Sequence, residues 1–175
     1  DCFNMEEQPI VNRVAKSKIQ TIDLEKFFPE GERLALDISQ WLYKGFILKE
    51  KDFRAALKEH DWDQYTGKYI ALYCSNDAIV PEWAYMLVST YLRDKAQKVI
   101  FGSLHELELL LFSDVINEID LEKYTDKPVI IKGCSQKEIP QNAYVQLVQK
   151  LQPIVKTMMF GEACSSVPLY KKTRK

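Results

Sequence analysis

The sequence predicts a single α/β domain with three layers, in which a mainly parallel sheet carries helices on both faces. Two observations predict this class. From Lys68 onward short apolar runs rich in β-formers alternate with segments of helical periodicity, and no linker rich in glycine, serine and proline divides the 175 residues. Strands that alternate with helices favour a parallel sheet covered on its faces. We therefore expect one domain over residues 1–175, with residues 1–10 flexible and residues 171–175 forming a basic tail.

The first predicted elements lie in a mixed N-terminal third. Residues 32–39 (ERLALDIS) alternate between apolar and polar side chains, as a half-buried strand does, and residues 50–60 have the spacing and composition of a helix. Residues 68–74 (KYIALYC) form an apolar run that predicts a buried strand. The next helix is predicted over residues 81–94, because Pro81 is favoured in a first helical turn.

The pattern of strand and helix then repeats toward the C-terminus. Residues 98–102 (KVIFG) predict a strand, and the helix after it begins at Ser103, which is spaced from Glu106 as in a capping box. Three further segments complete the pattern as a strand, a helix and a final strand: residues 127–134, 140–152 and 154–161.

Three of the four cysteines are followed by serine and, a few residues later, by proline: Cys74, Cys134 and Cys164. When the chain is aligned on itself at Pro81 and Pro140 with a gap of one residue, the two segments share Cys, Ser, Pro, Ala and Tyr. An old duplication and two similar solutions to one structural demand explain this similarity equally well. In either case Cys74 and Cys134 occupy equivalent positions.

Each of these three cysteines follows a predicted strand. Because parallel strands end at the same edge of a sheet, we expect the three thiols at one rim, where ligand sites form in open α/β sheets. A helix start, which Cys74 and Cys134 precede, favours a thiolate, and the following serine can bond the sulfur or cap the helix. Thiolates bind soft acceptors, so the sequence predicts a zinc ion or an iron–sulfur cluster as the cofactor.

A tetrahedral site needs further ligands, and three residues near the predicted rim are candidates: His105, Asp77 and Glu162. If none of them binds, the metal keeps an open position for water, substrate or a partner's ligand, which suits a carrier or a catalyst. Cys2 carries less weight, because Asp1 is not an initiator methionine and the native start is unknown. No catalytic residue is predicted. The predicted metal ligands are Cys74, Cys134, Cys164, His105, Asp77 and Glu162.

Composition and missing motifs exclude several classes of function. The chain has 24 basic and 25 acidic residues, a balance that argues against a nucleic-acid partner. It has no GxGxxG, Walker, GxSxG or CxxC motif, so no nucleotide cofactor is expected. No secretory signal opens the sequence and no apolar run reaches the ~18 residues of a membrane span. We expect a cytoplasmic protein without a membrane partner, in which the cysteines stay reduced.

Two alternatives to a metal or cluster site stay open at this point. One is a thiol enzyme or persulfide carrier, in which a single activated cysteine acts and the others resolve or pack. The other is an interaction module without chemistry, since free cysteine often behaves as a small buried hydrophobe. Neither an enzymatic activity nor the oligomeric state follows from the residues.

Four segments carry a resemblance to a known family: GFILKEKDFR, CSNDAIVPEWAYML, KGCSQKEIPQNAYVQLVQKLQP and MMFGEACSSVPLYKK. They resemble an uncharacterised bacterial family known as domain of unknown function 2480, from about Val11 to Lys172. All three Cys-Ser pairs stand where the family pattern has them, while DCFN before Met5 falls outside it. The resemblance implies no established activity. It implies genes near those for iron–sulfur cluster assembly, and therefore iron–sulfur assembly proteins as partners.

Overall fold

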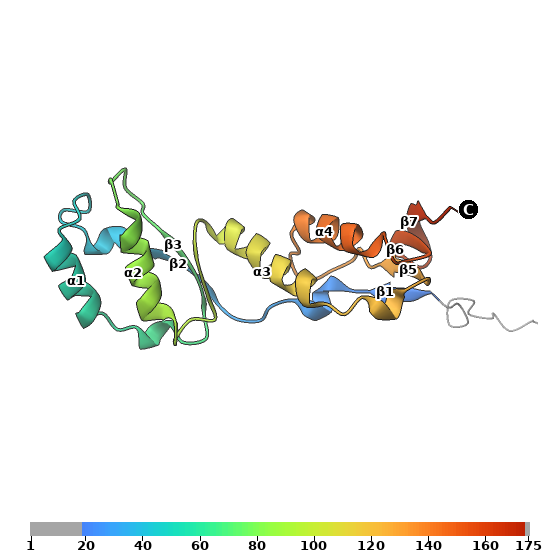
Figure 1. The fold of residues 1–175 in the computed structure, drawn as a ribbon, viewed down its shortest axis with the longest axis horizontal. Coiled ribbons are helices and arrows are strands. Elements are labelled where there is room, and N and C mark those ends of the chain that lie inside the picture. The colour runs from blue at the N-terminus through green and yellow to red at the C-terminus, as the bar shows by residue number, and fades with distance from the viewer. Residues whose placement is uncertain (1–18, 174–175) are drawn as a thin grey trace, which may run out of the picture. The chain divides into compact units, whose positions relative to one another are not determined.

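The computed structural model describes residues 19–173, and these residues fold into two compact units. Unit 1 combines the chain up to Phe28 with the chain from Glu118 onward, and unit 2 comprises Pro29–Asn117. Each unit has its own sheet, as Figure 1 shows. The α/β class with mainly parallel strands is confirmed, but the strands form two sheets instead of one. The expected single domain stays a prediction.

The sheet of unit 2 contains three parallel strands in the order β2-β3-β4. These strands are β2 (Arg33–Asp37), β3 (Tyr69–Tyr73) and β4 (Lys98–Phe101). The central strand β3 is buried on both sides, because Ile70, Ala71 and Leu72 are at most 2% exposed. An apolar run without alternation is the signature of such a strand.

Helices cover both faces of this sheet. Helices α1 (Glu50–Glu59) and α2 (Glu82–Leu92) pack with Ile70 and Leu72 into one core cluster. Helix α3 (Leu104–Glu118) packs against Ala71 on the opposite face. Unit 2 is therefore the predicted three-layer arrangement on a small scale.

The sheet of unit 1 has the order β1-β5-β6-β7. The first three strands run parallel and β7 is antiparallel to β6. Helix α4 (Gln141–Leu151) lies between β5 and β6 in the chain, and its Tyr144 ring meets Phe160 of β6 edge to face at 5.6 Å. The strands are β1 (Gln20–Ile22), β5 (Pro128–Ile131), β6 (Thr157–Glu162) and β7 (Ser165–Lys171).

Two strands of unit 1 were not predicted, and β6 is not the final strand. β1 has only three residues, too few to show a period of two. β7 contains Pro168. Proline in a sequence usually indicates a loop, but it is tolerated on an edge strand such as β7. The predicted basic tail is also partly structured, since Lys171 ends β7 and the Lys172 amide donates to the Lys156 carbonyl at 2.9 Å. The flexibility expected of residues 1–10 lies outside the described residues.

The predicted capping box at the start of α3 is confirmed. The Ser103 hydroxyl accepts from the Glu106 amide at 3.2 Å, and the Glu106 carboxylate accepts from the Ser103 amide at 2.6 Å. These hydrogen bonds from Ser103 hold the pKa of Glu106 below its ordinary value.

The two units repeat one structural plan. In unit 2 the Gly67 amide donates to the Lys95 carbonyl at 2.9 Å, and in unit 1 the Asp126 amide donates to the Ile154 carbonyl at 2.8 Å. Gly67 and Asp126 both have a positive φ, of 74° and 54°. The interval in the chain from Gly67 to Asp126 equals the interval from Lys95 to Ile154. The repetition therefore extends well beyond the identities around the Cys-Ser pairs.

A histidine in the aromatic core of unit 2 makes stability depend on pH. His60 lies against the rings of Trp41 and Trp62 at 5.0 and 4.8 Å, and its Nε2 is 2.7 Å from the Tyr65 hydroxyl. Burial lowers the pKa of His60 below its ordinary 6.5, against an opposing effect of Asp61.

We expect this histidine to destabilise the fold in acid. A lowered folded pKa means that its contribution is fully present above pH 6.5 and is lost as the pH falls through the lower folded value. His60→Gln should therefore lose less stability than wild type between pH 7.5 and 5. Urea unfolding at both pH values measures this difference. His105→Gln, at the other histidine and exposed, is the control and should behave as wild type.

No helix within residues 19–173 is both long enough and apolar enough to cross a bilayer.

Candidate functional site at the carboxyl edges of the two sheets

The carboxyl edge of the unit 2 sheet carries Cys74. This residue follows β3 directly and is half-buried, and its Sγ donates to the Asn76 carbonyl at 3.4 Å. It also packs against the core cluster beneath α1 and α2. Cys74 thus contributes to packing as well as to the rim.

A carboxylate accepts hydrogen bonds from the loop that follows Cys74. Asp37, the last residue of β2, accepts from the Ser39 amide at 2.9 Å and from the Ser75 amide at 3.1 Å. The two serine hydroxyls lie 3.2 Å apart. Burial alone would raise the pKa of Asp37, but the hydrogen bonds from Ser75 and Ser39 outweigh it and the pKa lies below its ordinary value.

Of the two roles that the sequence allows for these serines, bonding the sulfur or capping the following helix, capping does not occur at α2 or α4. The N-cap positions of α2 and α4 are Pro81 and Pro140, and neither helix has a side-chain cap. The loops between strand and helix are too long for a serine to reach the first turn. Ser135 instead bonds within its own loop, where its hydroxyl accepts from the Lys137 amide at 3.1 Å.

The carboxyl edge of the unit 1 sheet carries two exposed thiols. Cys134 follows β5, and Cys164 lies in the two-residue turn that joins β6 to β7. β5 and β6 are neighbours in the sheet. A Cβ placed on Gly133 would lie 3.4 Å from the Cα of Gly161, so the backbones that lead to the two cysteines are in close contact. The structure thus brings Cys134 and Cys164 to one end of one sheet.

Charged side chains lie close in the chain to these two thiols: Lys132 precedes Cys134 and Glu162 precedes Cys164 by two residues. Lys132 Nζ lies 3.4 Å from a carboxylate oxygen of Asp23, and this hydrogen bond and charge raise the pKa of the lysine, with a smaller effect from Glu162. The Oε1 atom of Glu162 is buried without a hydrogen-bond partner in the described chain. A buried carboxylate oxygen without a partner is costly, and a bound cation would relieve that cost.

Each rim also holds a tyrosine that is not among the predicted ligands. Burial raises the pKa of Tyr85, and the charges of Cys74 and Asp37 raise it further. Burial likewise raises the pKa of Tyr144, here with Asp23 and Glu25. The self-alignment had matched these two tyrosines. Of the two aspartates, Asp37 ends the predicted strand of residues 32–39, whereas Asp23 follows β1, which the sequence does not predict.

The six predicted ligands are divided between the units. Cys134, Cys164 and Glu162 belong to unit 1, whereas Cys74 and the exposed Asp77 and His105 belong to unit 2. Among residues 19–173 no three Cys, His, Asp or Glu side chains already form a group that could hold a metal. The meeting of all three thiols in one site stays a prediction. Cys2 lies outside the described residues.

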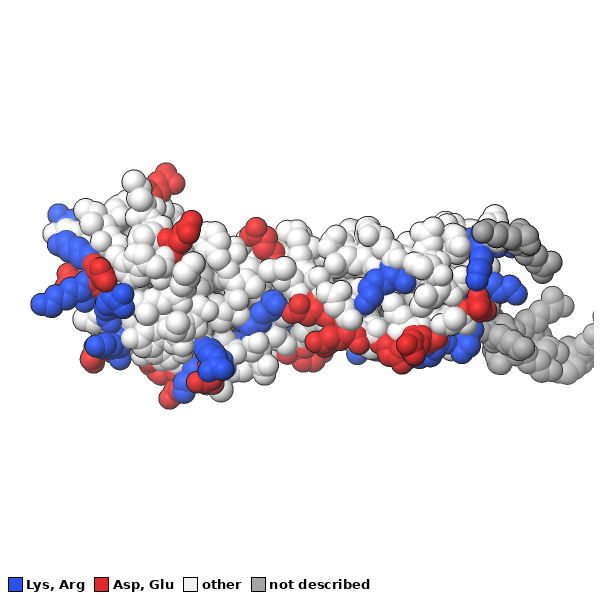
Figure 2. Space-filling model, viewed as in Figure 1, with Lys and Arg blue, Asp and Glu red and all other residues white. Residues whose placement is uncertain are grey.

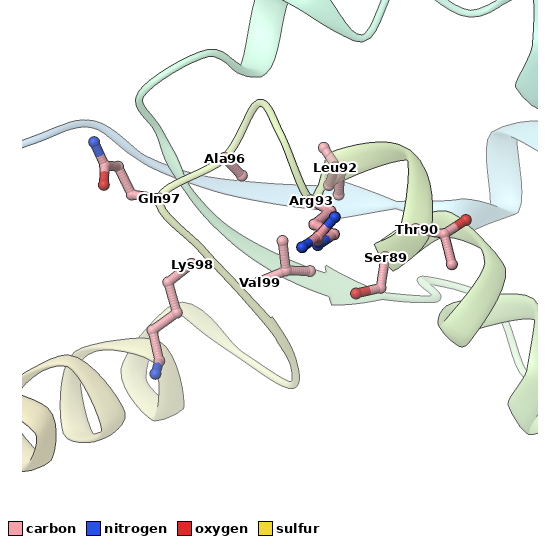
Figure 3. Close-up of a pocket in the computed structure, with 8 residues that line it drawn as sticks. All are labelled: Ser89, Thr90, Leu92, Arg93, Ala96, Gln97, Lys98 and Val99. Carbon is pink, nitrogen blue, oxygen red and sulfur yellow. The ribbon is translucent and has the colours of Figure 1, made fainter.

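One pocket opens next to Cys134 in unit 1, and another lies in unit 2. The first, of about 400 Å³, is lined by residues that include Gly133, Ser135 and Tyr144, next to Cys134. The second, in Figure 3, lies between the end of α2 and the start of β4, at the amino ends of the strands. Its Lys98 turns toward α3, where it pairs with Asp114 at 2.6 Å. The first pocket is therefore the one that belongs to the rim.

Neither a curated protein nor a solved structure matches this chain. A family model does match it, from residue 8 to residue 172, which is nearly its whole length and includes all three Cys-Ser pairs. The chain therefore belongs to the family described as Protein of unknown function (DUF2480).

Proposed function

We propose that this protein carries a soft metal ion or an iron–sulfur cluster in cluster assembly or trafficking, in the cytoplasm. The observation that supports this most is the position of Cys134 and Cys164, both exposed beyond neighbouring strands of one sheet. Zinc and iron–sulfur clusters prefer thiolate ligands, and a reducing compartment keeps such thiols available. The unpartnered carboxylate oxygen of Glu162, which precedes Cys164 by two residues, is the candidate for a third ligand once the ion is bound.

The incomplete ligand set favours a carrier over a permanent structural site. Structural zinc sites have four protein ligands already in place. The described chain has no such group, so the two thiolates of unit 1 would share the ion with a thiol or a partner that delivers or receives it. Iron–sulfur assembly proteins are the partners that this role requires. Exposed thiols at an edge of the sheet are accessible to a protein of that kind.

Single substitutions test the proposal through metal binding. We expect wild-type protein, purified without oxygen, to bind about one equivalent of Zn²⁺ or Co²⁺ in the presence of glutathione. Cys134→Ser and Cys164→Ser should each reduce that binding at least tenfold, because each removes one of two protein thiolates. The absorption of the Co²⁺ form reports the number of sulfur ligands directly. The metal that remains bound to the protein after dialysis against glutathione gives the stoichiometry of binding.

Cys74→Ser is the matched control, since it removes a thiol from unit 2 only. It should bind metal as wild type does. If it loses metal together with the other two, the three-thiol site predicted from sequence replaces the site of unit 1. If none of the variants changes metal content and only one of them loses reactivity toward an alkylating agent at neutral pH, the protein is a thiol enzyme and the carrier role is wrong.

A further inference from the structure

A hairpin on unit 2 exposes apolar side chains. The Tyr43 amide donates to the Ile47 carbonyl at 2.7 Å, and the Ile47 amide returns a bond to Tyr43 at 3.1 Å. Lys44 and Gly45, in the three-residue loop between these partners, have positive φ values of 51° and 77°. Phe46 and Ile47 are 55% and 54% exposed. Large apolar side chains are thus exposed to solvent on a hydrogen-bonded hairpin.

A second loop is fastened to this hairpin. The Asn76 side chain donates to the Gly45 carbonyl at 2.7 Å, and a Cβ on Gly45 would lie 2.8 Å from that same nitrogen. The second loop carries Ile79, which is 95% exposed. Figure 1 shows both loops, in cyan and green, projecting from the same end of unit 2. We call the exposed apolar side chains of these two linked loops the apolar tip: Tyr43, Phe46, Ile47 and Ile79.

Unit 1 builds the same strand and helix plan without this tip. There the chain continues from the short 3₁₀ helix η1 (Leu24–Phe27) out of the unit at Phe28. In unit 2 the equivalent 3₁₀ helix η2 (Ile38–Trp41) leads into the hairpin and then into α1. The repeated fold does not need the hairpin, so a structural role does not account for its exposed side chains.

Lysines flank the hairpin. Lys49 Nζ lies 3.5 Å from the centre of the Tyr43 ring, and Lys44 Nζ lies 5.4 Å from it on the tip. Residues 43–49 contain no acidic side chain. Figure 2 shows further lysine and arginine side chains, with acidic ones among them, over the end of unit 2 that carries the hairpin and α1. The hairpin that carries Phe46 and Ile47 is thus cationic, while the second loop carries one exposed carboxylate, Asp77.

We propose that the apolar tip inserts into the interface of an anionic membrane and docks the protein there peripherally. Short protruding apolar and aromatic side chains reach the boundary between headgroups and acyl chains, while neighbouring lysines stay with the headgroups. A tip of four side chains is too small for a stable interface with a second copy, which needs roughly 800 Å² per partner. The earlier expectation of no membrane partner rested on the lack of a spanning segment, which insertion of this kind does not require.

Vesicle flotation tests this proposal. We expect wild-type protein to float with vesicles of phosphatidylcholine and phosphatidylserine, to bind pure phosphatidylcholine much less, and to be released at high salt. The double variant Phe46→Ser/Ile47→Ser should bind about tenfold or more weakly. Lys44→Gln/Lys49→Gln should bind roughly fivefold or more weakly and lose most of the salt dependence.

The double variant Val167→Ser/Leu169→Ser is the control, because these side chains of β7 are similarly exposed, at 60% and 47%, in the other unit. It should bind as wild type does. Tryptophan fluorescence checks that the unit 2 variants remain folded. The proposal is wrong if wild type does not bind the anionic vesicles, or if the control loses as much binding as the hairpin variants. It is also wrong if the hairpin instead holds two copies together, which sedimentation would show as a dimer that Phe46→Ser/Ile47→Ser dissociates.

Discussion

Replacing Phe53 by alanine is expected to lower the free energy of unfolding of unit 2 by about 3–5 kcal/mol. Phe53 on α1 is fully buried. Its ring meets Trp41 and Trp83 edge to face, at 6.3 and 6.0 Å between ring centres. Truncation removes these contacts and leaves a cavity that the surrounding rings fill only partly.

Urea unfolding followed by tryptophan fluorescence measures this loss. All three tryptophans of the chain, Trp41, Trp62 and Trp83, belong to unit 2, so the fluorescence reports that unit alone. Phe46→Ala is the control, because Phe46 is exposed and its removal should change stability by less than about 0.5 kcal/mol. A loss below 1 kcal/mol in Phe53→Ala would show that α1 does not hold the core of unit 2 in the way described. Far-UV circular dichroism follows both units in the same titration.

The helices and the longer strands could be predicted from the sequence because local patterns determine them. The segment 50–60 has helical spacing, and α1 spans Glu50–Glu59. The segment 68–74 is an apolar run, and β3 spans Tyr69–Tyr73. Ser103 and Glu106 form the predicted capping box. Each of these signals is contained within one turn or one run of residues.

The division into two sheets could not be predicted because it depends on which strands pair. β5 follows β4 along the chain but pairs with β1, whose three residues lie more than a hundred positions earlier. No local pattern in Gln20–Ile22 indicates that this segment pairs with β5. The pairing of β5 with β1 also determines which cysteines lie at the same edge of a sheet. Once β5 and β6 belong to a sheet of their own, Cys134 and Cys164 share a rim, while Cys74 ends a strand of the other sheet.

The sequence shows that Cys74 and Cys134 occupy equivalent positions, but it does not show that these positions belong to two separate sheets. The self-alignment matched the two residues, and the structure places each after the second strand of its own parallel sheet. Equivalent residues of a repeat occupy the same position in separate units. A repeat therefore predicts two similar rims, whereas the expectation of one shared rim assumed a single sheet.

Gly161→Ala is expected to destabilise unit 1 by roughly 2–3 kcal/mol and to weaken metal binding at the same time. Gly161 has a φ of 122°, a region that side chains with a Cβ rarely adopt, and an added Cβ would lie 2.6 Å from the Ser165 carbonyl oxygen. That oxygen belongs to the backbone, so the turn between β6 and β7 has to shift. Cys164 lies in this turn, so a shift changes the position of its thiol relative to Cys134.

Gly67→Ala is the matched control for this substitution. Gly67 also has a positive φ, of 74°, but no atom lies within 4 Å of its added Cβ, so the loss should be about 1 kcal/mol from the backbone alone. Its metal binding should equal that of wild type, because Gly67 belongs to unit 2. Far-UV circular dichroism in urea gives the two stabilities, and titration with Co²⁺ gives the two affinities. If Gly161→Ala binds Co²⁺ as tightly as Gly67→Ala despite its lower stability, the turn that carries Cys164 does not contribute to the metal site, and the ligands of unit 1 have to be reassigned.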